Sequence, residues 1–360
     1  MGLTRIGIVY SPVYKRHLAK IAHCESPNRL TATIKLLKAR KIFQLREIEL
    51  IKPRKSSLKE LAEVHEITYI KLVKNLCKLG GGKIDEDTIV SKESFEVALY
   101  AVGGTLKACE LALKGMINGG FALIRPPGHH VGFRGRAMGA PSQGFCIFNN
   151  VALAAKFLMN KNLKRILIFD FDCHHGNGTQ EIFNTSPNVL YISTHQDPLT
   201  IYPGTGFIEQ IGSKDGAGFK VNIPLPPFTG DDAYSIILED IVSPLVREFK
   251  PEFILVSAGY DAHKDDPLTD MKLSLNSFRK ICRKMLEFSS RFCKGRLIFV
   301  LEGGYGQGLP EGIYVTLMEL CGKKPKIGEK MTKTDISTFR KVIKIKNRLH
   351  DILRNFWKLN

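Results

Sequence analysis

The sequence has no pair of cysteines at CxxC spacing, no apolar run long enough to cross a bilayer, and no apolar segment typical of a secretory signal. The first absence argues against a zinc ribbon or a thioredoxin-like redox site. The other two argue against a membrane-spanning or secreted protein. We therefore expect a cytoplasmic protein in a reducing compartment, with its eight cysteines present as free thiols.

Acidic residues are scarce compared with basic ones. The chain has 53 Lys and Arg against 35 Asp and Glu, so its formal net charge is +18. From Lys323 onward only Glu329, Asp335 and Asp351 are acidic, and this short region carries a large share of the excess. Such a charge fits a polyanionic partner, an acidic substrate or a Lys-rich surface of the kind found in thermophiles.

The same C-terminal region has apolar residues at helical spacing, which predict an amphipathic helix. They are Phe339, Val342, Ile343, Leu349, Ile352, Leu353 and Phe356. Because no Pro- or Ser-rich linker divides the chain, we expect one large domain over residues 1–322 and a basic helical extension over 323–360. Docking on the domain is the expected role of this helix, with weak contact to nucleic acid or a membrane surface as the alternative. The oligomeric state stays open.

Four apolar runs of β-type residues each lead directly into a cluster of His, Asp, Gly or Tyr. They are Phe121–Ile124 before RPPGHH, Ile166–Phe169 before DFDCHHGNGT, Phe253–Val256 before SAGYDAH and Leu297–Leu301 before EGGY. Helical patterns alternate with these runs, and another covers residues 57–79. This rhythm predicts an α/β fold with a mostly parallel sheet covered on both faces. Because ligands bind beyond the carboxyl ends of such strands, we expect an enzyme with one composite site.

Two carboxylates and an imidazole are candidates for a metal site. Asp172 and His174 alternate after the second run, so on a continuing strand they would share a face, and Asp261 follows the third run. These ligands with one open position suit a catalytic zinc ion, and iron(II) or cobalt(II) would suit them too. A lone Asp at a strand end is more often a cap or turn former. A two-metal site would need further bridging carboxylates, whereas positions 175 and 177 are His and Asn.

The tandem histidines His129 and His130 follow a Pro-Pro-Gly turn that can aim both rings into one cavity. Hydrolysis of an amide needs proton transfer, which imidazoles perform. Asp170 and Asn177 are the expected partners that orient one ring each. After the fourth run, two glycines allow a sharp turn that can bring Tyr305 inward to stabilise an oxyanion. Alone, this Gly-Gly-Tyr turn is a weak signal.

Taken together, these motifs resemble the zinc-dependent histone deacetylases, in the class II-like branch with compact prokaryotic deacetylases and acetylpolyamine amidohydrolases. The matching segments are RPPGHH, GFCIFNN, DFDCHHGNGT, STH, YPGTG, NIPLP, SAGYDAHKDDP and LEGGY. The resemblance implies a single-domain, three-layer arginase/deacetylase-like fold with a central eight-stranded sheet. It also implies hydrolysis of an N-acetyl amide on a lysine-like or polyamine amine.

The resemblance assigns roles residue by residue. The implied zinc ligands are Asp172, His174 and Asp261, and the implied catalytic residues are His129, His130 as principal base, Tyr305, Asp170 and Asn177. The implied substrate-binding residues are Gly144, Phe145, Tyr202, Leu268 and the rim residue Asp87. A structural potassium site is implied at Asp170, Asp172, His174, Ser193 and Thr194.

The expected activity is removal of acetyl groups from acetylated lysine in proteins or peptides, by a water that the metal activates. Leu268 stands where a polyamine-selective relative has an acidic residue, which favours acyl-lysine over acetylated small amines. A small-molecule deacetylase is the alternative within the enzyme class. An inactive, basic DNA-associated binding protein is the alternative from another class.

Overall fold

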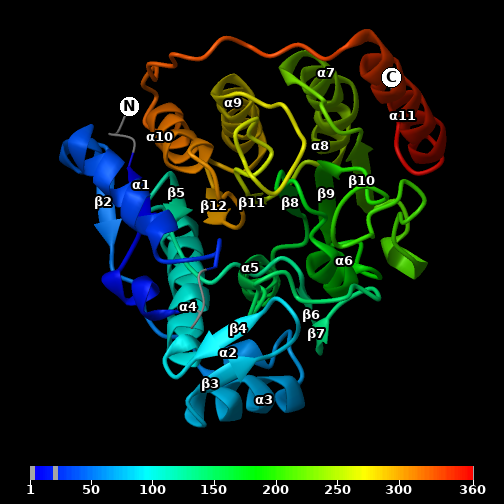
Figure 1. Cartoon of the computed structure of the whole chain (residues 1–360). Helices are drawn as coiled ribbons and strands as arrows, with labels where there is room; N and C mark the ends of the chain where they lie inside the picture. Colours follow the sequence, from blue (N-terminus) through cyan, green and yellow to red (C-terminus); the bar gives the residue numbers. More distant parts are fainter. Residues whose placement is uncertain (1–4, 19–22, 360) are drawn as a thin grey trace.

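The computed structural model describes residues 5–18 and 23–359. At its centre lies an eight-stranded sheet with the order β10-β9-β8-β11-β12-β5-β1-β2 (Figure 1). Every neighbouring pair is parallel, which confirms the expected sheet. The strands are β1 (Ile6–Val9), β2 (Ile48–Ile51), β5 (Gly119–Ala122), β8 (Ile166–Asp170), β9 (Val189–Gln196), β10 (Lys220–Leu225), β11 (Phe253–Ala258) and β12 (Leu297–Leu301).

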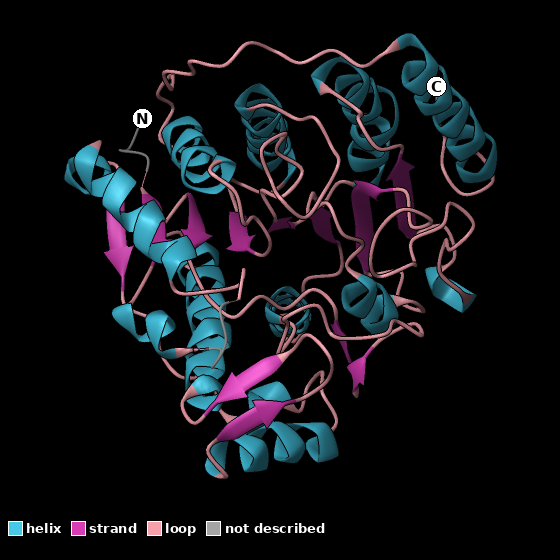
Figure 2. Ribbon diagram, viewed as in Figure 1, coloured by secondary structure: helices cyan, strands magenta, loops and turns pink. Residues whose placement is uncertain are grey.

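Helices cover both faces of this sheet and make three layers (Figure 2). One face carries α7 (Asp231–Ile237), α8 (Ser243–Phe249), α9 (Leu275–Phe292), α10 (Gly308–Leu320) and α11 (Ile336–Leu353), with α1 (Asn28–Ala39) packed against α10. The other face carries α4 (Ser94–Leu113), α5 (Asn150–Met159) and α6 (Asn177–Phe183). The arrangement follows from crossover connections, which place a helix on the sheet between successive parallel strands.

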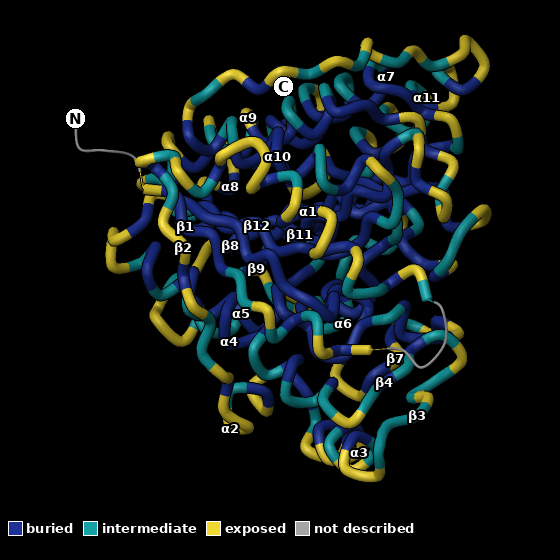
Figure 3. The backbone as a smooth tube through the Cα atoms, turned by 60° about the vertical axis from the view of Figure 1, so that its left-hand side comes forward, coloured by how far each residue is buried: buried dark blue, intermediate teal, exposed yellow. Residues whose placement is uncertain are grey.

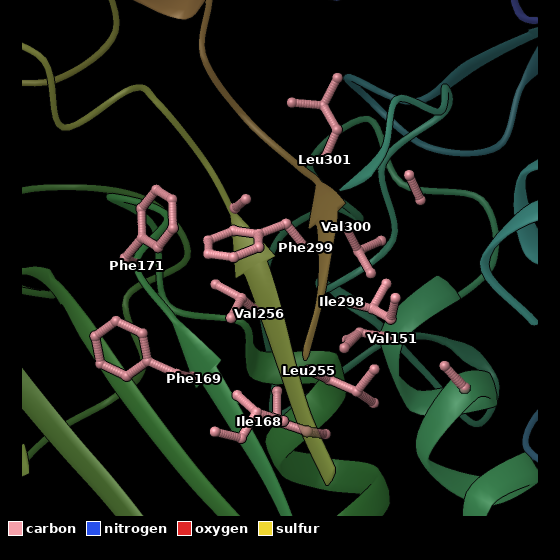
Figure 4. Close-up of a cluster of buried hydrophobic side chains, with 14 of the residues drawn as sticks. Val151, Ile168, Phe169, Phe171, Leu255, Val256, Ile298, Phe299, Val300 and Leu301 are labelled. Atoms are coloured by element: carbon pink, nitrogen blue, oxygen red, sulfur yellow. The ribbon is translucent and has the colours of Figure 1, made fainter. Parts of the chain in front are cut away.

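The strands that lead to the predicted site are buried along their whole length. Every residue of β5, β8, β11 and β12 is buried, and Figure 3 shows β8, β11 and β12 in the interior. In Figure 4, Ile168, Val256 and Phe299 from three neighbouring strands lie in one hydrophobic cluster. Continuous apolar runs are typical of parallel strands that are covered on both faces. Each such side chain stabilises the fold by roughly 1.5–3 kcal/mol.

The helical pattern over residues 57–79 predicts one helix, but the structure has two. They are α2 (Leu58–Leu61) and α3 (Ile67–Lys78). Between them His65 is buried, and its Nε2 accepts a hydrogen bond from the backbone N–H of Asn149 at 2.9 Å. This contact across the fold outweighs the local preference for helix. Two antiparallel pairs lie outside the sheet: β3 (Gly81–Lys83) with β4 (Ile89–Ser91), and β6 (Val131–Gly132) with β7 (Gly135–Arg136).

The basic C-terminal region forms a helix that docks beside the edge strand β10. α11 buries Val342, Leu349 and Leu353, and the indole of Trp357 donates to the carbonyl oxygen of Gly218 at 2.8 Å. Phe356 was expected on the apolar face, but it is 43% exposed because the helix ends at Leu353. The domain boundary at residues 322 and 323 stays a prediction. In the described residues, no helix has the length and apolarity that a bilayer span requires.

Candidate active site

A cavity of about 250 Å³ opens beyond the carboxyl ends of the central strands. Most of the residues named from the sequence line it, and they come from loops that follow different strands. They are His129, His130, Gly144, Phe145, Asp172, His174, Tyr202, Leu268 and Tyr305, with Asp87 from the β3–β4 turn. Because the strands are parallel, their carboxyl ends meet at one edge, which is where the sequence predicts the site.

The three expected metal ligands meet beside this cavity. Ligand atoms of Asp172, His174 and Asp261 all lie within 4.8 Å of one another, and we call these residues the inner triad. His174 Nδ1 is 2.9 Å from Asp261 Oδ2 and 3.2 Å from Asp172 Oδ1. The prediction that Asp172 and His174 share one face of a strand is wrong. The strand β8 ends at Asp170, and both residues lie in the bend that follows it. The bend, rather than the pleat, turns them toward Asp261.

The inner triad concentrates negative charge in a buried place. The side chains of Asp172 and Asp261 are at most 1% exposed, and in the described part of the chain only histidines pair with them. Burial, with repulsion from Asp172, raises the pKa of Asp261 to about 7. A divalent cation would relieve this repulsion, because an opposite charge favours the ionised form. Two carboxylates and an imidazole are ligands that zinc accepts, so the residues fit that ion.

The loop after β12 approaches the inner triad so closely that only glycine fits. The backbone N–H of Gly303 donates to Asp172 Oδ2 at 2.7 Å. A Cβ atom at position 303 would collide with the carboxylate oxygens of both Asp172 and Asp261. The glycines of the EGGY motif therefore bring the backbone against the ligands, which is a close approach of the kind that glycine permits.

Two further groups of described residues have metal-ligand spacing. One consists of His129, Cys146 and Glu302. The other consists of His263, Asp265 and Glu329, and we call this second group the outer triad. Burial raises the pKa of Cys146 well above that of a free thiol, which disfavours the thiolate that binds metal. At the outer triad, the ammonium of Lys264 lies 3.6 Å from Glu329 Oε2 and already supplies a positive charge. Neither group fits a metal ion as well as the inner triad does.

The two adjacent histidines have different partners. His129 Nδ1 lies 3.1 Å from Asp170 Oδ2, whereas His130 Nδ1 lies 2.8 Å from Asn177 Oδ1. Asn177 Nδ2 donates to the carbonyl oxygen of Ala137 at 2.9 Å, so its amide oxygen faces His130. An amide oxygen only accepts hydrogen bonds, so the proton of neutral His130 sits on Nδ1 and its Nε2 is left as an acceptor.

These partners also separate the protonation behaviour of the two rings. Burial opposes the charged form of His129, but the carboxylates of Asp172 and Asp170 outweigh it and raise its pKa to about 10. Burial lowers the pKa of His130 well below that of a free imidazole, and positive charge on His129 and His174 lowers it further. The tandem pair therefore combines a cationic ring with a neutral one.

Aromatic rings and a glycine form the wall of the cavity. Phe145 packs edge-on against Tyr305, with ring centroids 5.7 Å apart, and Tyr202 stands edge-on to His130 at 4.9 Å. Phe145 has a φ of 68°, a left-handed conformation that is costly for a bulky residue. At Gly144, a Cβ atom would lie 2.5 Å from His130 Cδ2. Leu268, which is 38% exposed, also lines the cavity.

Sequence reasoning gave no role to three buried residues that hold the site loops through backbone groups. Glu302 Oε2 accepts from the N–H of His129 at 3.2 Å, and Arg29 Nε donates to the carbonyl oxygen of Gly304 at 2.8 Å. Asp266 Oδ2 accepts from the N–H of Tyr305 at 2.7 Å. Their partners are main-chain atoms, which have no signature in a sequence. Glu302 and Asp266 do stand inside the quoted segments LEGGY and SAGYDAHKDDP, and a charged residue at a position expected to be buried was a further signal.

Three implied potassium ligands, Asp170, Ser193 and Thr194, lie in the neighbouring strands β8 and β9, and Asp172 and His174 lie in the bend after β8. Asp170 is paired with Ser193 in the sheet, and Thr194 Oγ1 donates to the carbonyl oxygen of Asp170 at 3.4 Å. The hydroxyl of Ser193 lies 2.8 Å from His195 Nδ1. Carbonyl and hydroxyl oxygens suit a hard cation, so the donor set fits potassium. Potassium binding stays a prediction.

Comparisons with known proteins agree with this geometry. The profile of the histone deacetylase domain matches residues 23–316. A probable deacetylase of Archaeoglobus fulgidus is 43% identical over 299 residues, which cover 83% of this chain and 81% of that protein. A histone deacetylase-like amidohydrolase of Pseudomonas aeruginosa is 35% identical over 290 residues, which cover 80% and 74%. The crystal structure of the HDA15 HD domain matches with a TM-score of 0.86 at 30% identity, covering 98% of this chain and 95% of that one. The chain therefore belongs to the histone deacetylase family.

Proposed function

We propose that this protein is a zinc-dependent amidohydrolase that removes acetyl groups from lysine side chains of proteins or peptides. One observation carries the proposal: the inner triad, both adjacent histidines and Tyr305 gather around one cavity. Amide hydrolysis needs a Lewis acid, a proton acceptor and a donor to the developing oxyanion. Residues suited to each of these tasks are present, and the two relatives are named a probable deacetylase and a histone deacetylase-like amidohydrolase.

The inner triad would hold the zinc ion through two carboxylates and one imidazole. Bound zinc supplies Lewis acidity, which polarises an amide carbonyl and lowers the pKa of water. Asp172 is held by the N–H of Gly303, and Asp261 Oδ1 accepts from the N–H of Cys173 at 2.8 Å. These contacts prearrange the ligands, so little reorganisation is needed when the ion binds.

His130 is proposed to accept the proton of the attacking water. Its Nδ1–H is committed to Asn177, which leaves Nε2 as the free acceptor. The lowered pKa of its ring, caused first by burial, keeps the imidazole neutral as a base must be. His129, protonated beside Asp170, contributes positive charge where negative charge develops. The proton for the departing amine then comes from His130 or His129.

Tyr305 is proposed to donate a hydrogen bond to the amide oxygen as it becomes an oxyanion. Burial raises the pKa of its phenol, so the hydroxyl keeps the proton that it donates. Asp266 holds the backbone of Tyr305 through its N–H. A donor that is fixed in advance stabilises the transition state without reorganisation.

The cavity wall favours an acyl-lysine as the substrate. Phe145 and Tyr202 provide apolar surface for the aliphatic chain of a lysine, and Leu268 adds apolar surface without negative charge. Asp87, a cavity-lining carboxylate, can accept from a peptide N–H. Acetylated small amines are the second candidate, because a chain of methylene groups fits the same surface.

A substrate panel tests the proposal. The zinc-loaded protein is assayed with an acetyl-lysine peptide, acetylspermidine and longer acyl-lysine peptides, and we expect the highest kcat/KM on the acetyl-lysine peptide. Tyr305→Phe should lower kcat by about two to three orders of magnitude, since it removes one oxyanion donor. Tyr100→Phe, which lies outside the cavity lining, serves as the matched control. Full activity of Tyr305→Phe would exclude this role.

Weaker proposals concern partners and location. The basic face of α11 could contact nucleic acid weakly, and a cytoplasmic location stays a prediction. An inactive DNA-associated protein is the competing possibility. It would be favoured if the zinc-loaded protein bound DNA but turned over no member of the panel.

A further inference from the structure

After α10 the chain crosses the outer side of the molecule before it forms α11 (Figure 1). We call residues 323–335 of this crossing the strap. The family profile stops at residue 316, so the strap lies beyond the matched part of the chain. It makes polar contacts with three places: Glu47 just before β2, the β11–α9 loop (259–274) with the start of α9, and the start of α7.

Glu329 is the strap residue that contacts the β11–α9 loop. Its Oε1 lies 3.0 Å from Nε2 of His263, and its Oε2 accepts from the N–H of Leu275 at 3.1 Å. The N–H of Asp265 donates to His263 Nδ1 at 3.3 Å, so the ring proton sits on Nε2 and points at Glu329. Because His263 is only 2% exposed, water cannot easily replace this hydrogen bond.

The β11–α9 loop carries three groups of the active site. Asp261 belongs to the inner triad, and Leu268 lines the cavity. Asp266 Oδ2 accepts from the N–H of Tyr305 at 2.7 Å and from the N–H of Gly306 at 3.0 Å. The position of this one loop therefore affects a metal ligand, the cavity wall and the backbone that presents the phenol.

His263 lies where the first part of this loop, which follows β11, contacts the last part, which precedes α9. It forms an isolated bridge with Leu273, and the N–H of Lys264 donates to the carbonyl oxygen of Leu273 at 2.9 Å. In the sequence His263 stands between Asp261 and Asp266. A contact that fixes the ring of His263 therefore restrains both carboxylates.

The strap is held independently at a second place. Thr332 Oγ1 accepts from the N–H of Asp231 at 3.0 Å, and Asp231 Oδ2 accepts from the N–H of Thr332 at 2.8 Å. Thr334 donates its hydroxyl to Asp232 Oδ1 at 2.7 Å. These contacts hold the strap without any contribution from Glu329. Glu329 therefore reaches the loop from a fixed support.

We propose that Glu329 is a positioning residue for deacetylation: through His263 it holds the β11–α9 loop in the arrangement that places Asp261 and the backbone of Tyr305. This inference rests on the proposed function and extends it to a segment outside the matched family domain. Glu329 touches neither the cavity nor the inner triad, so it acts only through the loop.

Four variants of the full-length protein test the inference. Glu329→Ala removes the acceptor, and Glu329→Gln keeps an oxygen that can accept from His263. Lys330→Ala changes the exposed neighbour of Glu329 and is the matched control. Thr334→Val loosens the strap at its other support. Amide hydrogen exchange over residues 261–275, zinc affinity by chelator competition, and kcat with KM on an acetyl-lysine peptide are measured for each.

We expect Glu329→Ala to speed exchange in the loop by about tenfold and to weaken zinc binding about ten- to hundredfold, as loss of an outer support does at metal sites. kcat should fall more than KM rises, and Glu329→Gln should restore most of each loss. Thr334→Val, which leaves Glu329 in place, should give smaller losses of the same kind. Unchanged exchange and zinc affinity in Glu329→Ala, or equal losses in Lys330→Ala, would overturn the inference. If the wild-type protein cleaves no acetyl amide, the proposed function fails, while the exchange and zinc measurements still decide the role of Glu329.

Discussion

The inner and outer triads use the same kinds of side chain, and one stretch of sequence, 261–265, contributes to both. The inner triad is enclosed, with side chains at most 12% exposed and only histidines as cationic partners in the described residues. In the outer triad Asp265 is 56% exposed, and Lys264 lies beside Glu329. Burial without a fixed cation creates a need for a metal ion, whereas solvent and a lysine remove that need. Surroundings, rather than residue types, therefore decide which triad fits a metal ion.

The largest expected difference in activity is between two variants that each remove one carboxylate, one from the inner triad and one from the outer triad. Asp261→Asn should lower kcat/KM on an acetyl-lysine peptide by at least about three orders of magnitude, because Lewis-acid catalysis depends on the ligand set. Asp265→Asn should change it by less than about twofold, since exposed ion pairs contribute little. Metal content is measured on both proteins by elemental analysis. Stoichiometric zinc in Asp261→Asn, or none in Asp265→Asn, would reverse the comparison.

Zinc should stabilise the protein through the inner triad alone. At a free concentration about a thousandfold above its Kd, a ligand that binds only the folded state adds about 4 kcal/mol, which for a chain of this size is a rise of roughly 5 °C in Tm. Differential scanning calorimetry of the metal-free protein with and without zinc gives the shift. Asp261→Asn should lose it and Asp265→Asn should keep it. A shift that survives in Asp261→Asn would place the ion elsewhere.

The smallest expected effect concerns the lysine of the outer triad. Lys264→Ala removes the ammonium 3.6 Å from Glu329, and both side chains are partly exposed. We expect a loss of at most about 1 kcal/mol in the free energy of unfolding, with kcat unchanged. Urea denaturation and steady-state kinetics check both values. A large fall in kcat would mean that the charge, and not the His263 hydrogen bond, couples the strap to the site.

The fold was predictable where the hydrophobic pattern is strong. The runs that became β8, β11 and β12 are continuous and apolar because these strands are buried on both faces. The pattern failed over residues 57–79, where the chain leaves the helix so that His65 can reach the backbone of Asn149. At the C-terminus it failed at Phe356, which lies past the last helical turn. Contacts made across the fold decided both places.

The order of motifs along the chain was enough to identify the family and to assemble the inner triad, because parallel strands bring their carboxyl ends to one edge wherever they stand in the sequence. Residue types were likewise enough to name the imidazoles and the phenol as candidates for proton transfer and oxyanion stabilisation. Their roles stay predictions. Tertiary structure alone revealed the backbone contacts of Asp266 and Glu302, and the contact between Glu329 and His263. These carboxylates accept hydrogen bonds from backbone amides or from residues far away in the chain. Because a backbone amide is the same in every residue, the sequence does not show which amide a carboxylate contacts, and only the folded structure does.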